Sequence, residues 1–428
     1  MYSNPCIKWA LFSRSRALQQ LAFRLINPES SPFIPSDSSN SIIACGDMSF
    51  DPEYRMPPGV YRLREKHAGL MRLRRKIWQR LCKLIFSPRF LSHRIDTPYV
   101  ELLTKTSKNK KPKFLSEHYR TRIDIDVDYS AVNSRFAYPF KKIESFLKEK
   151  DIVWANLETP ISDSPRTYGF FISDPRYANA MKDAGITLVC LANNHIFDAG
   201  EVGFLDTIEH LEQMGIPYTG AGNNFEHARL GRLIKLNGKK IGFLSYTQYC
   251  NTNYASIAAE YSGILPLDPE IIVEDINIVK KSADYVLVSL HWGIINQHSI
   301  HRKQIEIAHL LIDAGADIIV GHSPHIPHGI EIYRGKPILY SLGNFIFPYN
   351  RTEWSDNFLA EIIINKKGVE GVMLHPISGQ GKDLFQPEIL KGERADSLLY
   401  ELQIKSAIFK TGIAIQNHIG YINLINHL

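Results

Sequence analysis

LVCLANNHIFDAG, residues 188–200, is an apolar run that stops at two asparagines and a histidine. Its apolar part predicts a short buried strand, and the polar residues that follow fall at the carboxyl end of that strand. Ligands of open α/β folds bind beyond the carboxyl ends of the strands. The stretch is therefore either a polar turn or one edge of a metal-dependent active site, and the rest of the chain decides between the two.

Four further apolar runs end in the same kinds of residue. Carboxylate and amide oxygens together with imidazole nitrogens suit divalent ions such as Zn, Mn or Fe. Thiolates are absent from these polar clusters, which disfavours a purely structural zinc site. The glycines before Asp47 and His322 are expected to allow tight backbone turns. The four runs are SIIAC before Gly46-Asp47, DIVWA before Asn156-Leu157-Glu158, ADYVLVSL before His291-Trp292-Gly293, and ADIIV before Gly321-His322-Ser323-Pro324-His325.

Apolar strands alternate with amphipathic helices from about residue 136 onward, which predicts an α/β domain. The helix at 201–215 is expected to bury one side that carries Val202, Leu205, Ile208 and Leu211. The other predicted helices are 138–150, 174–185 and 302–315, and the predicted strands are 151–158, 186–192, 240–247, 283–290, 316–322, 336–347, 358–365 and 368–377.

Composition shifts predict the domain organisation. Residues 1–40 are expected to be an N-terminal extension and a Ser- and Pro-rich linker. The main domain is expected over residues 41–390, with a basic insert at 55–122, and a helical tail is expected over residues 391–428.

Positive charge is concentrated in the insert. The 428-residue chain has a net charge of +6, and residues 55–122 hold 19 Lys and Arg against four acids, a net +15, which leaves −9 for the remainder. Apolar residues recur at helical spacing in this segment, so it is a solvated face, a surface that contacts an anionic membrane, or a binding surface for an acidic polymer. It matches no nucleic-acid-binding module, so no specific nucleic acid is expected as a partner.

Several features favour a cytoplasmic location, with the insert as the candidate for peripheral membrane contact. No apolar run is long enough to cross a bilayer. The N-terminal apolar stretch is broken by Ser13, Arg14 and Arg16 and makes a poor secretory signal. The five cysteines form no CxxC pair and are odd in number, which is typical of free thiols in a reducing compartment.

Several blocks of the sequence resemble the capsule-synthesis CapA family, which is associated with poly-γ-glutamate biosynthesis. The blocks are GDMSF at 46–50, NLETPIS at 156–162, LANNHIFDAGEVGFLDTIEHLEQMGIPYTGAG at 191–222, HWG at 291–293 and GADIIVGHSPHIPHGIEIYRGKPILYSLGNFIF at 315–347. The resemblance implies a calcineurin-like metallophosphoesterase fold, an α/β/β/α sandwich. It also implies one or two divalent metal ions and an anionic polymer or phosphate-containing substrate.

The resemblance further implies a role for each of seven residues, and the spacing adds an eighth, Asp198. His195 matches the histidine that helps to protonate the leaving oxygen. Asp198, three residues later, is a candidate to orient His195, as carboxylates behind an active-site histidine do. The implied metal ligands are Asp47, Glu158, Asn194, His291, His322 and His325.

Three departures from the family pattern stand beside these matches. Ser49 occupies a place where calcineurin-like enzymes have a histidine, which bears on the number of metal ions held. Ile294 and Ile295 stand where many members have Glu-Tyr, and Ser323 stands where many have a second histidine. The latter departures bear on the shape of the substrate pocket and on the level of activity.

Structural interpretations compete with the functional ones at several positions. Asn193 and Asn194 are also typical turn residues. Asp198-x-x-Glu201 is a helix capping-box pattern, which does not exclude a role for Asp198 beside His195. The remaining candidates are Tyr340 and Asn344 as pocket residues, Phe345 as a core residue, and His298, His301 and His328 as solvated surface residues.

These observations favour a CapA-like, metal-dependent hydrolase or accessory protein in capsule or poly-γ-glutamate biosynthesis. One alternative is a metallophosphoesterase that acts on a small phosphate ester. Another is a non-catalytic polymer-binding assembly protein whose site has degenerated. Whether the protein is an enzyme stays open at this point, because a shared fold does not by itself transfer a function.

Overall fold

The computed structural model describes residues 32–36, 39–50, 121–122, 136–164, 171–250, 262–350, 354–365 and 368–424. All of them fall within one compact unit, residues 1–52 and 121–428. The predicted basic insert lies outside the described residues, except for the short strand β2 (Thr121–Arg122), which pairs with β15 (Tyr349–Asn350). Most of the predicted N-terminal extension lies outside them too.

The larger sheet contains the three strands formed by the apolar runs that precede Asp47, Glu158 and the Asn193-Asn194-His195 loop. Its strand order is β18-β19-β17-β16-β1-β3-β4-β5, and β14 also pairs with β1. β1, β3, β4 and β5 run parallel to one another, and β16 runs antiparallel to β1. The bounds are β1 Asn40–Met48, β3 Ile152–Leu157, β4 Leu188–Cys190, β5 Tyr218–Thr219, β14 Asn344–Ile346, β16 Asn357–Ile364, β17 Val369–Ile377, β18 Ala414–Gln416 and β19 Ile419–Asn423.

The smaller sheet has the order β12-β13-β11-β10-β8-β7, with β8, β10, β11 and β13 parallel. A separate pair is formed by β6 (Ala221–Gly222) and β9 (Gly263–Ile264). The bounds of the sheet strands are β7 Arg232–Leu236, β8 Lys239–Thr247, β10 Tyr285–His291, β11 Ile318–His322, β12 Ile330–Tyr333 and β13 Lys336–Leu339.

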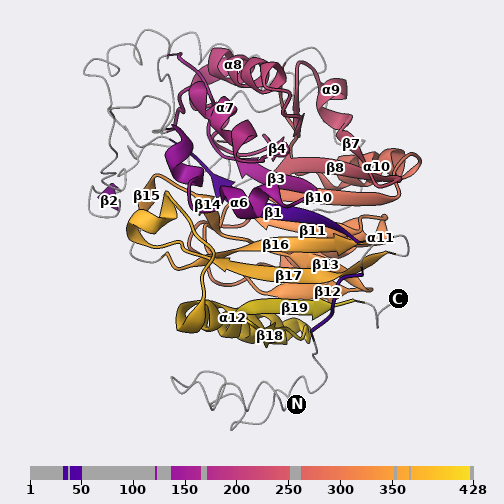
Figure 1. Cartoon of the computed structure of the whole chain (residues 1–428). Coiled ribbons are helices and arrows are strands. Elements are labelled where there is room, and N and C mark those ends of the chain that lie inside the picture. Colours follow the sequence, from indigo (N-terminus) through magenta and orange to yellow (C-terminus); the bar gives the residue numbers. More distant parts are fainter. Residues whose placement is uncertain are drawn as a thin grey trace, which may run out of the picture. The chain divides into compact units, whose positions relative to one another are not determined.

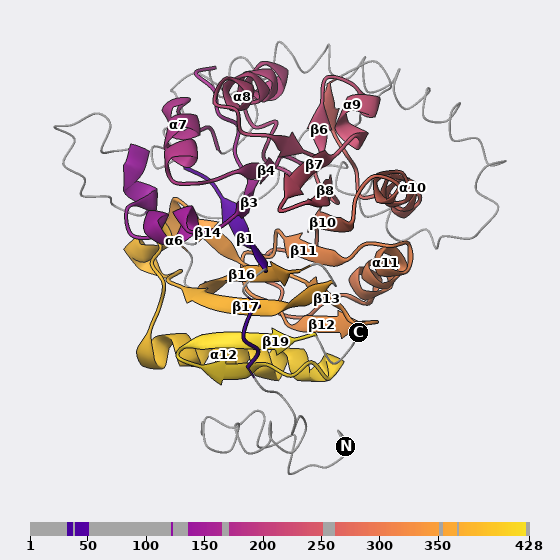
Figure 2. The same ribbon diagram turned by 45° about the vertical axis from the view of Figure 1, so that its right-hand side comes forward.

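The two sheets pack face to face, with most helices on their outer sides and α12 (Gly392–Ser406) at the end of the sandwich, against strands of both sheets (Figures 1 and 2). One apolar core joins the sheets, and it includes Ile42 and Trp154 from the larger sheet and Phe243 and Leu287 from the smaller. A second core joins the smaller sheet to α10 (Pro269–Lys280) and α11 (Arg302–Asp313). The continuous apolar runs of the central strands follow from this burial on both faces. The expected α/β/β/α sandwich is confirmed.

Local sequence sets the helix boundaries. Asp268 caps α10, accepting hydrogen bonds from the backbone N–H groups of Glu270 and Ile271. α11 begins with a capping box in which His301 accepts from the N–H of Lys303 and the Gln304 side chain accepts from the N–H of His301. The other helices are α6 Glu144–Lys148, α7 Arg176–Asp183, α8 Gly200–Gln213, α9 Phe225–Arg229 and α12 Gly392–Ser406, with short 3₁₀ turns at Tyr138–Phe140, Gly381–Leu384 and Ala407–Phe409.

The buried face predicted for the 201–215 helix is partly wrong. Ile208 and Leu211 are buried, but Val202 and Leu205 are 60% and 41% exposed, and Phe204 takes the inward position. Phe204 stacks on Phe197 of the preceding loop, with ring centroids 4.5 Å apart, and this contact is part of the buried face.

The helical tail expected over residues 391–428 is only partly present: α12 forms the helix, but the chain then continues as a β-hairpin, so the helical prediction is wrong for residues 414–423. α12 packs against β17, β19 and β12, and the hairpin β18–β19 extends the larger sheet beyond β17. Figure 1 shows α12 beside these last strands. No helix in the described ranges has the length and apolar character needed to cross a membrane.

Candidate metal centre

The five predicted strand ends meet at one edge of the sandwich. In the larger sheet, the register places Asp47 opposite Asn156, and Asn156 opposite Cys190, just before the Asn193-Asn194-His195 loop. In the smaller sheet, His291 lies opposite His322. Parallel strands bring their carboxyl ends to the same edge, and the two sheets present those edges to each other.

The two glycines next to the site serve a different purpose from the one expected. Neither Gly46 nor Gly321 has a positive φ, and each lies inside a strand, so the tight turns predicted there are wrong. Instead, a Cβ at Gly46 would lie 2.1 Å from the carbonyl oxygen of Gly343, and one at Gly321 would lie 2.0 Å from that of Tyr340. Glycine is required because neighbouring backbones approach too closely for a side chain.

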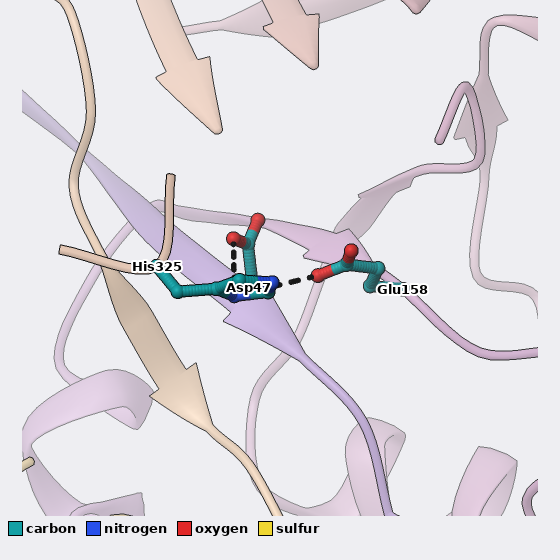
Figure 3. A group of neighbouring side chains, drawn as sticks. All are labelled: Asp47, Glu158 and His325. Atoms are coloured by element: carbon teal, nitrogen blue, oxygen red, sulfur yellow. Dashed lines mark ion pairs between the residues drawn. The ribbon is translucent and has the colours of Figure 1, made fainter. Parts of the chain in front are cut away.

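Glu158 lies at the centre of the cluster and is 1% exposed. Its Oε1 lies 3.5 Å from His291 Nε2 and 4.0 Å from His195 Nε2, and its Oε2 lies 4.0 Å from His325 Nδ1. Glu158, Asp47 and His325 each offer a ligand atom, and these three atoms lie within 4.8 Å of one another. Figure 3 shows the two carboxylates and the imidazole of His325 directed toward one another.

Asp47 is fully buried and surrounded by donors. Its Oδ2 accepts from the N–H of Ser323 at 3.1 Å and lies 3.2 Å from His325 Nδ1, and its Oδ1 lies 3.5 Å from His322 Nδ1. Burial alone would raise the pKa of this carboxyl, but the nearby imidazoles of His322 and His325 hold it well below its ordinary value. Asp47 is therefore ionised in the buried cluster.

Glu158 has the opposite electrostatic situation. Burial, and then the nearby charges of Asp47 and Asp198, raise its pKa well above the ordinary value. Neither of its carboxylate oxygens has a hydrogen-bond partner among the described residues, and the same holds for His322 Nδ1. Buried polar atoms are nearly always paired in proteins. Orphaned carboxylate oxygens and an orphaned imidazole nitrogen at one point are ligand atoms that fit a divalent cation.

His291 and Asn194 add two further candidate ligand atoms. His291 Nε2 lies 2.7 Å from Asn194 Oδ1, which comes from the loop after β4 in the other sheet. Burial lowers the pKa of His291 to about 3, so the imidazole is neutral at physiological pH. A neutral imidazole is the form of histidine that ligates metals.

His195 and Asp198 form a hydrogen-bonded pair beside this centre. His195 Nδ1 lies 2.7 Å from Asp198 Oδ2, and that oxygen also accepts from the N–H of Phe171 at 3.0 Å. The capping interpretation of Asp198 is wrong, because α8 begins at Gly200, with Ala199 as its N-cap and no side-chain cap. The Phe171 ring packs edge-on against His195, with centroids 4.3 Å apart.

The two adjacent asparagines divide the roles that the sequence left open. Asn193 is the turn residue, since its Oδ1 accepts from the N–H groups of His195 and Ile196. Asn194 faces His291, as described above. A single dipeptide thus supplies both the local turn and a candidate ligand.

All eight residues given a site role in the sequence therefore meet in the structure, and Asn156, Ser323 and Asn344 join them. Asn156 donates to Asp47 Oδ1 at 2.8 Å. The backbone N–H of Ser323 reaches Asp47 because Ser323 adopts a φ of +94°. Asn344, which had been considered for the pocket, accepts from His325 Nδ1 at 2.8 Å. The signal that could have identified Asn156 is its place in the same strand-end motif as Glu158.

Other predicted histidines and aromatic residues take different places. His328 is 1% exposed and its Nε2 donates to the carbonyl oxygen of Gln297, so its assignment to the solvated surface is wrong. His298 and His301 are exposed, as expected. Tyr340 does not face the site: it belongs to the helix-side core and its hydroxyl donates to Glu331 Oε2 at 2.6 Å. Phe345 is a core residue, as expected.

The positions that depart from the family pattern lie close to the cluster. Ser49 is fully buried, and its hydroxyl has no hydrogen-bond partner among the described residues. Ile294 and Ile295 are 54% and 45% exposed, directly after the His291-Trp292-Gly293 strand end. Ser323 contributes its backbone N–H rather than a side-chain ligand.

Comparison with known proteins assigns the family. A family described as bacterial capsule synthesis protein PGA_cap matches residues 104–349, more than half of the chain. The chain belongs to this capsule synthesis family. It is 33% identical to the PGA biosynthesis protein CapA of Bacillus subtilis over 245 residues, which cover 56% of this chain and 64% of that one. It is 31% identical to the capsule biosynthesis protein CapA of Bacillus anthracis over 254 residues, or 57% and 62% of the two chains.

The matched region spans a little under two thirds of the length of these two Bacillus relatives. Among solved structures, the NAD nucleotidase NadN of Haemophilus influenzae is similar with a TM-score of 0.36 and 17% identity, over 65% of this chain and 52% of that one. Membership of the capsule synthesis family therefore comes from the sequence matches and not from this weak structural likeness.

Proposed function

We propose that the protein is a metal-dependent hydrolase that acts in capsule or poly-γ-glutamate biosynthesis. The observation that carries the proposal is the buried carboxylate of Glu158, which has no hydrogen-bond donor among the described residues and lies between Asp47, His291 and His325. A carboxylate in this environment is costly to bury unless a cation is held with it. Family membership supports the biological setting.

The donor set fits one or two divalent ions of the Mn, Zn or Fe class. Asp47, Glu158, Asn194, His291, His322 and His325 would hold them, with Glu158 placed between the residues of the two sheets. When bound, such an ion supplies a polarised scissile group and a water of lowered pKa.

Proton transfer falls to His195 in this proposal. Asp198 accepts from His195 Nδ1 and fixes the ring, so that Nε2 faces the centre, 4.0 Å from Glu158 Oε1. The N–H of Phe171 holds Asp198 in place from the other side. An oriented imidazole with one nitrogen tied to a carboxylate can hold or release a proton at the atom that leaves.

An anionic polymer is the proposed partner. The similar Bacillus proteins are named for PGA and capsule biosynthesis, which points to a polymer rather than a small phosphate ester. We also propose a cytoplasmic location with peripheral contact to the membrane. The basic insert at 55–122 is the proposed surface for the polymer or the membrane. Apart from β2, this insert lies outside the described residues.

The test is hydrolysis by the purified full chain loaded with Mn²⁺ or Zn²⁺, with poly-γ-glutamate and a chromogenic phosphodiester as separate substrates. His195→Ala should lower kcat by about 10²–10⁴-fold, because it removes the acid–base group. Asn194→Ala should lower metal affinity as well as turnover. His227→Ala, an exposed histidine on α9, is the control and should leave turnover unchanged.

The outcomes separate the candidate functions. Turnover of poly-γ-glutamate that depends on His195 supports the proposal, whereas turnover of the phosphodiester alone favours a phosphoesterase of small substrates. Polymer binding without any turnover in the metal-loaded protein would identify a non-catalytic assembly component and overturn the proposed hydrolase.

A further inference from the structure

Asn156 occupies the point where the two sheets meet at the metal centre. It is the penultimate residue of β3, pairs in register with Asp47 on β1, and is 1% exposed. Its side chain reaches across to His291 at the end of β10 in the smaller sheet. Among the residues described around the centre, its amide connects a carboxylate of one sheet with an imidazole of the other.

The contacts of the amide determine its orientation. Nδ2 lies 2.8 Å from Asp47 Oδ1 and 3.2 Å from His291 Nδ1. An ionised carboxylate can only accept, so the nitrogen of the amide must face Asp47. The amide nitrogen also contacts the His291 ring on the side of Nδ1. The other ring nitrogen of His291 then points to Asn194 Oδ1 at 2.7 Å and Glu158 Oε1 at 3.5 Å.

A second amide supports the first. Asn193 Nδ2 donates to the carbonyl oxygen of Leu157 at 2.7 Å and lies 3.4 Å from Asn156 Oδ1. Asn193 Oδ1 in turn accepts from the backbone of the His195 loop. Asn156 is thereby fixed at both ends of its amide, with its oxygen toward the β4 loop and its nitrogen toward the candidate ligands.

We propose that Asn156 is a positioning residue that holds Asp47 and His291 at the spacing needed to bind a divalent metal ion. The inference rests on the metal centre of the proposed function. An asparagine suits this task because its amide nitrogen donates to the Asp47 carboxylate and contacts the His291 ring without adding charge. An aspartate would place another carboxylate against Asp47, and alanine has neither the donor nor the contact with the His291 ring.

The experiment measures binding of Mn²⁺ alone, by calorimetry, to the metal-free full chain and its Asn156→Ala variant. Groups behind metal ligands typically contribute about 10–100-fold to metal affinity, and a loss in that range is expected. Asn40→Ala is the matched control: Asn40 is equally buried, at the opposite end of β1, and its Oδ1 accepts from Asn237 Nδ2. Its Mn²⁺ affinity should equal that of the wild type.

Thermal unfolding in a chelator separates positioning from general stability. If Asn156 is a positioning residue, the unfolding temperature of metal-free Asn156→Ala should be no lower than that of metal-free Asn40→Ala. The Mn²⁺ affinity of Asn156→Ala should nevertheless fall. The double variant Asn156→Ala/His291→Ala should lose less affinity than the two single variants added together, because Asn156 acts through His291. If Asn156→Ala does not fold, Asn156→Ser, which keeps one donor, replaces it with the same expectations.

Several outcomes overturn the inference. Wild-type Mn²⁺ affinity in Asn156→Ala, or strict additivity with His291→Ala, would show that Asn156 does not position the ligands. If the wild-type chain binds neither Mn²⁺ nor Zn²⁺, both this inference and the proposed metal centre are wrong. If the wild type binds metal but hydrolyses nothing, the hydrolase proposal fails while the role of Asn156 stands or falls on the affinities.

Discussion

Two buried glutamates on either side of β1 have opposite environments. Glu158 follows β3 and is 1% exposed, and Glu361 lies on β16 and is 5% exposed. Glu361 receives hydrogen bonds from His375 Nε2 at 2.6 Å and Lys150 Nζ at 2.8 Å, whereas Glu158 receives none among the described residues. The pKa of Glu361 is lowered by these partners despite burial, and that of Glu158 is raised by burial and neighbouring acids.

The difference indicates what each carboxylate is for. Glu361 is satisfied by side chains of the protein and joins the outer face of the sheet to the segment after α6. Glu158 is surrounded by groups that could share a cation with it but do not neutralise it. Protein interiors rarely keep an uncompensated carboxylate unless binding or catalysis requires it. The same residue type is therefore structural in one place and, in our account, a metal ligand in the other.

The largest effect is expected at Glu158. Glu158→Gln should reduce Mn²⁺ affinity by more than the roughly 100-fold typical of groups behind the ligands, because a central ligand is lost. In a chelator, the same variant should unfold no earlier than the wild type, because a neutral amide is less costly to bury than an ion. Calorimetry and thermal unfolding measure the two effects. A wild-type affinity, or a marked loss of metal-free stability, would remove the distinction between the two glutamates.

Glu361→Gln makes the same chemical change and should have the opposite pattern. It should destabilise the metal-free protein by about 1.5–3 kcal/mol, the usual range for hydrogen bonds to a charged group. Its Mn²⁺ affinity should be that of the wild type. Urea unfolding near neutral pH in a chelator gives the free energy of unfolding. A neutral or stabilising effect would contradict the structural role of Glu361.

Acid should weaken the Glu361 cluster selectively. The pKa of Glu361 is below its ordinary value of 4.5, so its contribution to stability is fully present above 4.5 and is lost as the pH falls through the folded-state value. The free energy of unfolding of the wild type should therefore fall more steeply than that of Glu361→Gln below about pH 4.5. Parallel curves from urea unfolding across this range would show that the carboxylate is not held by its partners.

The smallest effect is expected at Lys150. Lys150→Met removes one of the two donors to Glu361 and leaves His375, so a loss of about 1 kcal/mol is expected. The control is Lys148→Met on α6, where Lys148 pairs with Glu144 in an exposed i,i+4 ion pair worth about 0.3–0.5 kcal/mol. Urea unfolding of both variants compares them directly. Equal losses would mean that burial of Glu361 adds nothing to its ion pair.

Much of the fold and of the site could be predicted from the sequence because the candidate ligand residues directly follow recognisable strands. The apolar runs before Asp47, Glu158 and His291 identify parallel strands, and parallel strands place their ends together. The runs do not reveal which residues approach closely in space. The reason for Gly46, a contact with the backbone of Gly343 almost 300 positions later, is visible only in the folded chain.

Local patterns also failed where tertiary contacts prevailed. The capping-box pattern at Asp198 was outweighed by hydrogen bonds to His195 and Phe171, which no helix rule anticipates. His328 was assigned to the solvated surface, yet it is buried and hydrogen-bonded to the carbonyl oxygen of Gln297. Asn156 resembles any turn asparagine until its two partners, from different sheets, are brought together.

Anomalous diffraction at the manganese edge, from crystals of the full chain soaked in Mn²⁺, tests the central claim most directly. The account predicts a peak within coordinating distance of the carboxylates of Glu158 and Asp47. It further predicts that the peak disappears in Glu158→Gln crystals, while Glu361→Gln crystals keep it. Manganese found only away from Glu158, or a peak that survives Glu158→Gln unchanged, would contradict it.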